Sequence, residues 1–337
     1  MTIRYLTKCP PLPNPLSLLH SNFSSSQQTI QESLQSAIQS KSYTQIPNIL
    51  TSLNPNNPNP FSFLSSYTQP LKTQIIDQIL QSLIPIRPRS LPHLTYSYLL
   101  SHTLENPDPF PLTFAILQRT LRSGGTPVKQ THLSLSSTWI TYRKHDSVPG
   151  ILSAMRAIGY KPDLNTCNYL VQSLCAVDQF DESVRVLKCM GQVGCEPNSE
   201  SYGLVIGSLC GAKKTNDAVE LVKEMVRVEN RVVLRQGTVV KLMAAMKANG
   251  EIKKAVEMVE LLEKVGVRVG FEGYEVLVEG CLEKKEFVLG GKMVIQMVEK
   301  GFIPYIRVRQ RVLDGLASVG KRQFACLVRQ KLADVRS

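Results

Sequence analysis

The chain has 337 residues, of which 43% are hydrophobic and 20% charged, so it can bury a sizeable core. No apolar run approaches the roughly 20 residues that a membrane-spanning helix needs, which argues against an integral membrane protein. The formal net charge of +12 favours polyanionic partners such as nucleic acids, although a basic balance is also typical of a targeting segment.

The first 29 residues are basic and rich in hydroxyl side chains. They include Arg4 and Lys8 but no acidic residue, and a serine-rich run occupies residues 21–26. Such a stretch resembles an organelle transit peptide and lacks the long apolar segment of a secretory signal. A disordered tail is the alternative. We expect residues 1–29 to direct the protein to an organelle, with the mitochondrion preferred over the chloroplast.

The next region, residues 30–92, has a weaker pattern. Residues 54–60, Asn-Pro-Asn-Asn-Pro-Asn-Pro, predict a linker or long turn, since proline blocks helix continuation. We assign degenerate helical repeats to the rest of this region. Only four acidic residues occur up to residue 125, and the character of the chain changes near residue 126.

The later sequence repeats itself with a period of 35 residues. Glycine recurs at 124, 159, 194, 266 and 301, in steps of 35 apart from one double step of 72. Proline recurs at 127, 162 and 197, and methionine at 155, 190 and 225. The sequence Ser-Leu-Cys at 173–175 returns at 208–210. A fixed period of this length predicts one supersecondary unit stacked many times, in which each unit buries its apolar face against its neighbours.

Within one repeat the apolar pattern is helical. Apolar or small residues between 164 and 175 fall at steps of three and four, which predicts a first helix. A second helix is predicted from Asp181, with acidic residues near the positive end of its dipole. Gly194 suits a left-handed helix stop, and Pro197 prevents continuation. The repeat is therefore helix, turn, helix, loop.

These residues resemble a pentatricopeptide repeat of the P type, a plant organellar family. The resemblance rests on Leu-Asn-Thr-Cys-Asn-Tyr-Leu-Val from Leu164, Ser-Leu-Cys, Phe-Asp-Glu-Ser-Val from Phe180, Met190, Gly194 and Glu-Pro-Asn from Glu196. A tetratricopeptide repeat has a period of about 34 residues and a Trp/Gly/Tyr pattern that is absent here. The resemblance implies an all-α fold, a right-handed superhelical α-solenoid of helix-turn-helix repeats.

Extending the register divides the chain into repeats. The predicted pentatricopeptide-type repeats are 93–128, 129–163, 164–198, 199–235, 236–270 and 271–305, followed by a truncated basic capping repeat at 306–337. The resemblance is strong over 129–235, fair over 236–305 and weak before residue 93.

The resemblance also implies a function, which is binding of single-stranded organellar RNA in transcript processing, stability or translation. In such repeats, side chains at the fifth and last positions read one base. Asn168 and Asn198 occupy these positions in one repeat and suggest a pyrimidine. Ser97 and Asp163 are the other base-reading candidates. For Asn168, the alternative is a helix-start residue that bonds its own backbone.

Several positions depart from the pattern of the family. The second position, normally aliphatic, holds Asn165, Glu200 and Glu272 in three repeats, and carboxylates repel a phosphate chain. The fifth position holds Gly203, Val240 and Glu275 in the later repeats, which fit no usual base-reading pair. We therefore expect a short or degenerate RNA footprint. The alternative is a helical-repeat adaptor for protein partners in an organellar complex such as the mitochondrial ribosome.

The segment from residue 306 is the most basic stretch of the chain. Its candidates for phosphate contacts are Arg307, Arg309, Arg311, Lys321 and Arg322. Such a patch adds salt-dependent affinity without reading sequence. The alternative is a solvated polar cap, which each end of a solenoid needs.

No chemistry beyond binding is indicated. The cysteines make no Cys-x-x-Cys pair, which argues against zinc, and core packing explains Cys175 and Cys210. The five histidines are scattered, and no Gly-rich phosphate loop or nucleophile motif accompanies them. We expect no catalytic residue, no cofactor and no metal.

Overall fold

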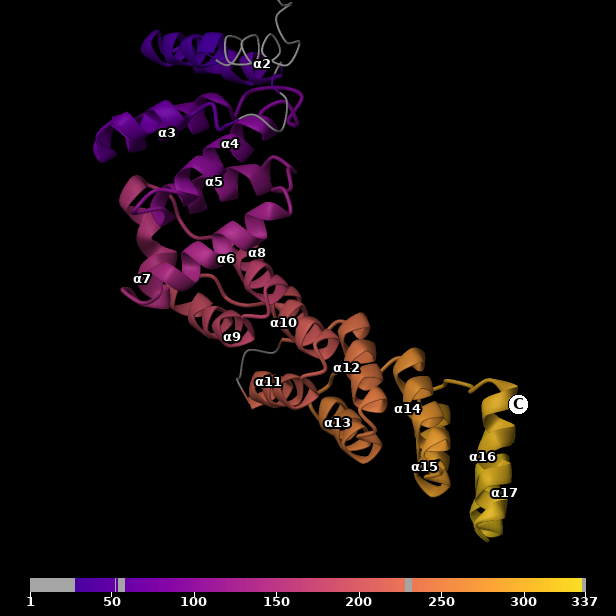
Figure 1. Ribbon diagram of the computed structural model, residues 1–337. Helices are drawn as coiled ribbons and strands as arrows, with labels where there is room; N and C mark the ends of the chain where they lie inside the picture. Colours follow the sequence, from indigo (N-terminus) through magenta and orange to yellow (C-terminus); the bar gives the residue numbers. More distant parts are fainter. Residues whose placement is uncertain (1–27, 52, 54–57, 228–231, 335–337) are drawn as a thin grey trace, which may run out of the picture. The chain divides into compact units, whose positions relative to one another are not determined.

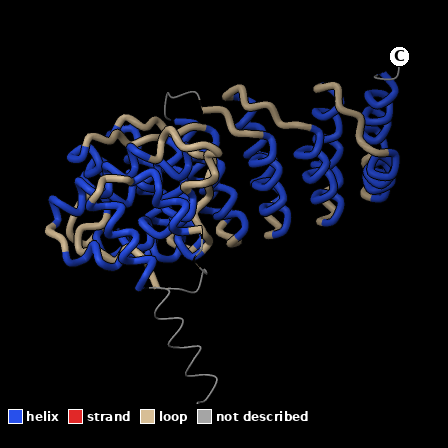
Figure 2. Tube along the Cα trace, turned by 90° about the horizontal axis from the view of Figure 1, so that it is seen from above, coloured by secondary structure: helices blue, strands red, loops and turns tan. Residues whose placement is uncertain are grey.

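The computed structural model describes residues 28–51, 53, 58–227 and 232–334 (Figure 1). Throughout these residues the regular secondary structure is helical (Figure 2). None of the described helices combines the length and the apolarity needed to cross a membrane. Most of the expected transit peptide, residues 1–27, and part of the expected linker, residues 54–57, lie outside the described residues.

The chain divides into two compact units, Met1–Thr166 and Cys167–Ser337. The first unit contains a helix over residues 28–39 and then a series of further helices. These are η1 (Tyr43–Gln45), α2 (Ile46–Leu50), η2 (Ser62–Ser66), α3 (Gln69–Ser82), α4 (His93–Leu104), α5 (Phe110–Arg122), α6 (Gln130–Tyr142), α7 (Val148–Ser153) and η3 (Ala154–Ile158).

The second unit is a regular series of helix pairs that begins with α8 (Leu164–Ala176), a helix that starts just before the boundary. The remaining helices are α9 (Phe180–Cys189), η4 (Met190–Val193), α10 (Ser199–Gly211), α11 (Thr215–Arg227), α12 (Gln236–Ala248), α13 (Ile252–Lys264), α14 (Phe271–Glu283), α15 (Phe287–Glu299), α16 (Ile306–Ser318) and α17 (Arg322–Asp334). The helices predicted over 164–175 and from Asp181 are α8 and α9, so both predictions are confirmed.

Helices pack on their equivalents one repeat further along, above all the first helices of successive repeats. In the second unit, α10 packs on α12, α12 on α14 and α14 on α16, while α15 packs on α17. In the first unit, α2, α4 and α6 follow one another in the same way, and α3 packs on α5. Stacking of this kind buries a continuous core that no single repeat can form. The predicted all-α repeat fold is confirmed.

The core side chains come from one stripe of each helix. Val205 and Leu209 of α10, Leu242 and Met246 of α12, and Leu277 of α14 are all at most 1% exposed. Their spacing of four residues keeps them on the side of the helix that faces the next repeat. The apolar residues that recur at helical spacing in the sequence are therefore the residues that are buried in the structure.

The recurring glycines end the second helix of their repeats. Gly194 has a φ of +81°, and the N–H of the next residue, Cys195, donates to the carbonyl of Met190 at 3.0 Å. This arrangement satisfies a helix-end carbonyl and needs a left-handed residue, for which glycine has no Cβ penalty. Gly159, Gly266 and Gly301 adopt φ values of +82° to +83°. The glycines that recur along the sequence are therefore residues at which helices end.

The last segment is more complete than a truncated repeat. Both α16 and α17 have 13 residues, the length of most helices in the second unit. Val312, Leu316 and Val328 are fully buried, because the apolar stripe continues at helical spacing and α16 and α17 pack on α15.

A glycine pair tests the role of the helix stops. Gly194→Ala should lower the free energy of unfolding by about 1 kcal/mol, because a left-handed conformation disfavours any Cβ. A Cβ there meets no atom within 4 Å, so the loss is conformational. Gly211 lies at the exposed end of α10, where an added Cβ also meets no atom within 4 Å. Gly211→Ala should therefore raise the free energy of unfolding by roughly 0.5–1 kcal/mol. Urea unfolding measures both, and equal losses would contradict the assignment.

Candidate nucleic-acid interface

The predicted base-reading residue Asn198 stands at the N-terminus of α10. Its backbone is extended, and its side-chain Oδ1 accepts hydrogen bonds from the N–H groups of Glu200 (2.9 Å) and Ser201 (3.0 Å). The hydroxyl of Ser201 in turn accepts from the N–H of Asn198 at 3.2 Å. These reciprocal bonds form a capping box, which satisfies N–H groups that the helix leaves unpaired. Asn198 is therefore held in one orientation by the start of its neighbouring helix.

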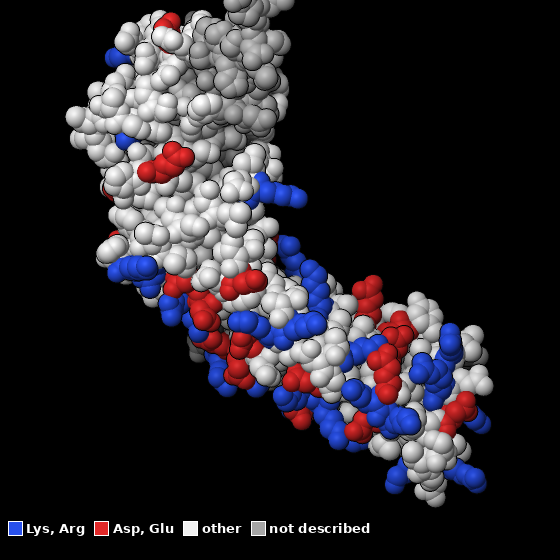
Figure 3. Space-filling view, in the orientation of Figure 1, with Lys and Arg blue, Asp and Glu red and all other residues white. Residues whose placement is uncertain are grey.

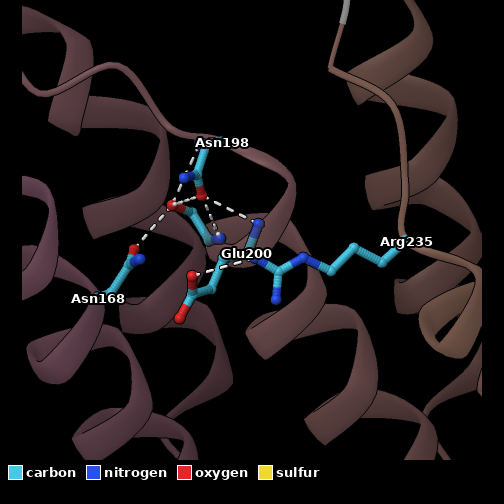
Figure 4. A network of polar contacts seen from close by, with 5 residues as sticks. Asn168, Asn198, Glu200 and Arg235 are labelled. Carbon is cyan, nitrogen blue, oxygen red and sulfur yellow. Dashed lines mark hydrogen bonds and ion pairs between the residues drawn. The ribbon is translucent and has the colours of Figure 1, made fainter.

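The second predicted residue, Asn168, is tied to the same serine. Asn168 is only 7% exposed, and its Oδ1 accepts a 2.7 Å hydrogen bond from the Ser201 hydroxyl. Ser201 lies one repeat further along, so it links the fifth residue of one repeat to the residue that ends it (Figure 4). The alternative role for Asn168 is not observed, since no bond to its own backbone occurs among the described residues.

The amide nitrogens of both asparagines stay available. Neither Asn168 Nδ2 nor Asn198 Nδ2 donates to another residue in the described part of the chain. The two Oδ1 atoms are already occupied by Ser201 and the start of α10. The pair therefore presents amide donors, and its acceptors are used internally.

Glu200, which the sequence suggested would repel phosphates, has a basic partner. Its carboxylate lies 3.3 Å from Nη2 of Arg235, the last residue of the same repeat. Both side chains are more than half exposed, so the ion pair contributes little stability. Its effect is local, because Arg235 offsets the negative charge beside Asn198. The sequence did not predict the pairing of Arg235 with Glu200 or the contact of Ser201 with Asn168, although separations of 35 and 33 residues are typical of contacts one repeat apart.

Ser97 and Asp163, both in the first unit, have local partners. The Ser97 hydroxyl donates to the carbonyl of His93 in its own helix at 3.0 Å. Asp163 accepts from the N–H of Thr166 at 2.9 Å, as an N-cap residue does. The same carboxylate forms a 2.9 Å ion pair with Arg122. Both oxygens of Asp163 are thus engaged, and Ser97 is the freer of the two.

Comparison with known proteins decides the family. The family model described as "PPR repeat" matches residues 165–195 and again 193–226. A pentatricopeptide repeat-containing protein of Arabidopsis thaliana is 54% identical over 316 residues, which cover 93% of this chain and 92% of the relative. The chain belongs to the pentatricopeptide repeat family.

Solved structures of the pentatricopeptide repeat protein PPR10 from maize are also similar to this chain. The crystal structure of PPR10 has a TM-score of 0.41 and 13% identity, with 95% of this chain and 57% of PPR10 covered. PPR10 in complex with an 18-nt psaJ RNA element has a TM-score of 0.37 and 15% identity, with coverage of 90% and 53%. The present chain thus matches a little over half of the length of PPR10.

One pentatricopeptide repeat carries an acidic first helix. Glu272, Glu275, Glu279 and Glu283 follow one another along α14 at steps of three and four. Lys247 of α12 pairs with Glu279 at 3.2 Å and with Glu283 at 2.9 Å. Burial, reinforced by the charge of Glu279, raises the pKa of Glu275, whose buried Oε1 has no hydrogen-bond partner among the described residues. This helix is unsuited to phosphates.

The last pentatricopeptide repeat presents basic side chains. Arg307 and Arg311 are exposed on α16, Arg309 is half-buried there, and Lys321 and Arg322 are exposed at the start of α17. Within the described ranges, none of these five forms an ion pair. In contrast, basic and acidic side chains interleave over the preceding helices of the second unit (Figure 3). The five candidates thus keep their charge free for an external anion.

The partly buried carboxyl of Glu275 predicts a pH-dependent stability change. A raised pKa means that ionised Glu275 destabilises the fold, so its contribution is favourable at low pH and is lost as pH rises through the raised pKa. Glu275→Gln should therefore increase the urea midpoint at pH 7. The increase should shrink as pH falls towards the ordinary glutamate pKa of about 4.3. The exposed Glu257→Gln on α13 is the control, and an equal pH-independent change in both variants would contradict this account.

Proposed function

We propose that this protein binds single-stranded RNA, with Asn168 and Asn198 reading one base. The observation that carries the proposal is the shared contact with Ser201, whose hydroxyl lies 2.7 Å from Asn168 Oδ1 and 3.2 Å from Asn198 Oδ1. This contact holds two amides from one repeat in fixed orientations, and pre-ordered donors lose less entropy on binding. Membership of the pentatricopeptide repeat family and the net charge of +12 support the same ligand.

The chemistry of the free amide groups favours a pyrimidine, and among pyrimidines cytosine. The pair offers N–H donors, and the Watson–Crick edge of cytosine presents two adjacent acceptors, O2 and N3. Uracil instead carries a hydrogen on N3, which needs an acceptor. Both Oδ1 atoms already accept hydrogen bonds within the protein. The site therefore has no free side-chain acceptor for the N3 hydrogen of uracil.

The footprint is short. Only one repeat has two amides at the base-reading positions, and the acidic helix α14 offers carboxylates where a phosphate chain would run. The unpaired basic residues of α16 and α17 supply phosphate contacts that do not depend on sequence. The expected binding is therefore one strong base preference combined with salt-sensitive affinity.

We further propose that the protein acts on an organellar transcript, in processing, stability or translation, without catalysing a reaction itself. The basic, acid-free composition of residues 1–29 supports import into mitochondria, with the chloroplast as the alternative destination. Fusion of residues 1–29 to a fluorescent protein tests this assignment. A cytosolic signal would contradict it.

A protein-binding role is the second candidate, and one surface favours it. Ile303, Tyr305 and Ile306, in and beside the loop before α16, are 42%, 63% and 69% exposed. Exposed apolar side chains in a group are typical of protein interfaces. Selection from random single-stranded RNA with the full chain separates the candidates. An enriched motif supports RNA reading, whereas weak and unselective retention favours the adaptor.

Asn198→Asp tests base reading while keeping the helix cap. Aspartate caps helices as well as asparagine does, so stability should not change, but the amide donor becomes an acceptor. Preference should shift from cytosine to uracil by about tenfold, as expected for one charged hydrogen bond. Asn216→Asp, the same change on α11, is the control. Unchanged preference in Asn198→Asp, measured by equilibrium binding of RNAs differing at one base, would refute the assignment.

The basic end predicts a change in salt dependence. Replacing Arg307, Arg311 and Arg322 together with glutamine should weaken binding equally for all RNA sequences. It should also reduce the slope of log affinity against log salt by about 2, at ~0.7 for each phosphate contact on a single strand. Lys253, Lys254 and Lys264 of α13, replaced in the same way, provide a control of equal charge. Equal slopes for the two triple variants would contradict a phosphate role.

A further inference from the structure

A cavity in the first unit is lined by four arginines. It has a volume of about 160 Å³ and lies among the end of α3, the loop over residues 83–92, the first turn of α4 and the last turn of α5. These helices lie side by side (Figure 1). The loop contributes Arg87 and Arg89, and α5 contributes Arg119 and Arg122. The buried Leu83 and Tyr96 also line the cavity.

The four guanidinium groups are held in different ways. Arg87 Nη1 donates to the carbonyls of Ile84 (3.0 Å) and Ile86 (2.9 Å), which fixes it to the loop. Arg119 Nη2 donates to Gln81 Oε1 at 3.3 Å, and its guanidinium lies 5.4 Å from the ring centre of Tyr160. These contacts are to neutral groups, so they orient two arginines without neutralising them.

Charge in this cavity is incompletely balanced. No carboxylate is among its described lining residues. Arg122 is the only one of the four with an ion pair there, to Asp163 at 2.9 Å. Arg119 Nε is buried with no hydrogen-bond partner, and Arg89 has no partner among the described residues. Asp77 is a lining residue of a different pocket, to which Arg119 and Arg122 also contribute, and it accepts from the Tyr160 hydroxyl at 2.9 Å.

Helix stability explains only part of this arrangement. Arg119 and Arg122 are in the last turn of α5, where a cation interacts favourably with the helix dipole. The interaction with the helix dipole does not explain the position of Arg89 in the loop. It also does not explain why the buried Nε of Arg119 lacks an acceptor. A buried donor without a partner costs about 1–3 kcal/mol, and a bound anion would remove that cost.

We propose that this arginine pocket binds a phosphate group of RNA, with a terminal phosphomonoester preferred over an internal phosphodiester. The planar forks of several arginines match the oxygens of a phosphate. A phosphomonoester carries about −1.5 to −2 charges at pH 7, which suits a site with three guanidinium groups that no carboxylate neutralises. Arg119 and Arg122 occupy neither the fifth nor the last position of their repeat, so this contact adds to base reading. The inference rests on the proposed RNA-binding function.

The experiment compares one short single-stranded RNA with a 5′-monophosphate, a 3′-monophosphate or hydroxyls at both ends, using the full chain. Removing the terminal phosphate should weaken binding by about tenfold. The double variant Arg87→Gln/Arg89→Gln should lose this difference, because both side chains lie on the loop and line the pocket. Lys41→Gln/Lys144→Gln is the control of equal charge, with both lysines exposed in turns between helices of the first unit.

Each outcome has a defined meaning. If terminal phosphates have no effect but the arginine variant binds RNA more weakly than the control, the pocket holds an internal phosphodiester. If the arginine variant and the control behave alike, the phosphate site is refuted. If no RNA binds at all, the proposed function fails, and inorganic phosphate then tests the pocket alone. Thermal stabilisation by phosphate over chloride at equal ionic strength should occur in the control and not in the arginine variant. Equal stabilisation of the arginine variant and the control by phosphate, or no stabilisation of either, would refute phosphate binding in this pocket.

Discussion

Contact between equivalent helices one repeat apart is the interaction on which this structure depends. A single pair of helices cannot bury all of its own apolar surface, so the remainder is buried against the next repeat. The packing of α10 on α12 and of α12 on α14, with Val205, Leu242 and Leu277 removed from solvent, is the physical result. The glycines that end the second helices let the chain turn into the first helix of the next repeat, where the same contact forms again.

The polar contacts follow the same spacing. Ser201 meets Asn168 across 33 residues, Arg235 meets Glu200 across 35, and Lys247 meets Glu279 across 32. A side chain therefore has its chemistry set by the residue one repeat away as well as by its own helix. This is why Glu200 and Glu275, both carboxylates on first helices, differ. One has an arginine partner at the surface, and the other is partly buried beside a second carboxylate.

The two proposed RNA contacts use different parts of the repeat. Base reading uses the start of the first helices, where the capping box of α10 also orients Asn198. The arginine pocket uses the end of a second helix and the loop that follows α3. Helix ends suit both base reading and phosphate binding, because their unpaired backbone groups form hydrogen bonds with polar side chains. These hydrogen bonds hold the side chains in fixed positions.

The sequence by itself determined the repeat, since helix spacing, helix stops and the apolar stripe are local properties that recur every 35 residues. It located the helices at 164–175 and from Asp181, and it selected Asn168 and Asn198. Only the tertiary structure decided what surrounds those residues. The link through Ser201, the pairing of Glu200 with Arg235, and the gathering of Arg87, Arg89, Arg119 and Arg122 around one cavity join residues from different helices. Hydrophobicity and helix propensity encode which face is buried, but the partner of a polar side chain depends on distances that exist only after the repeats have packed.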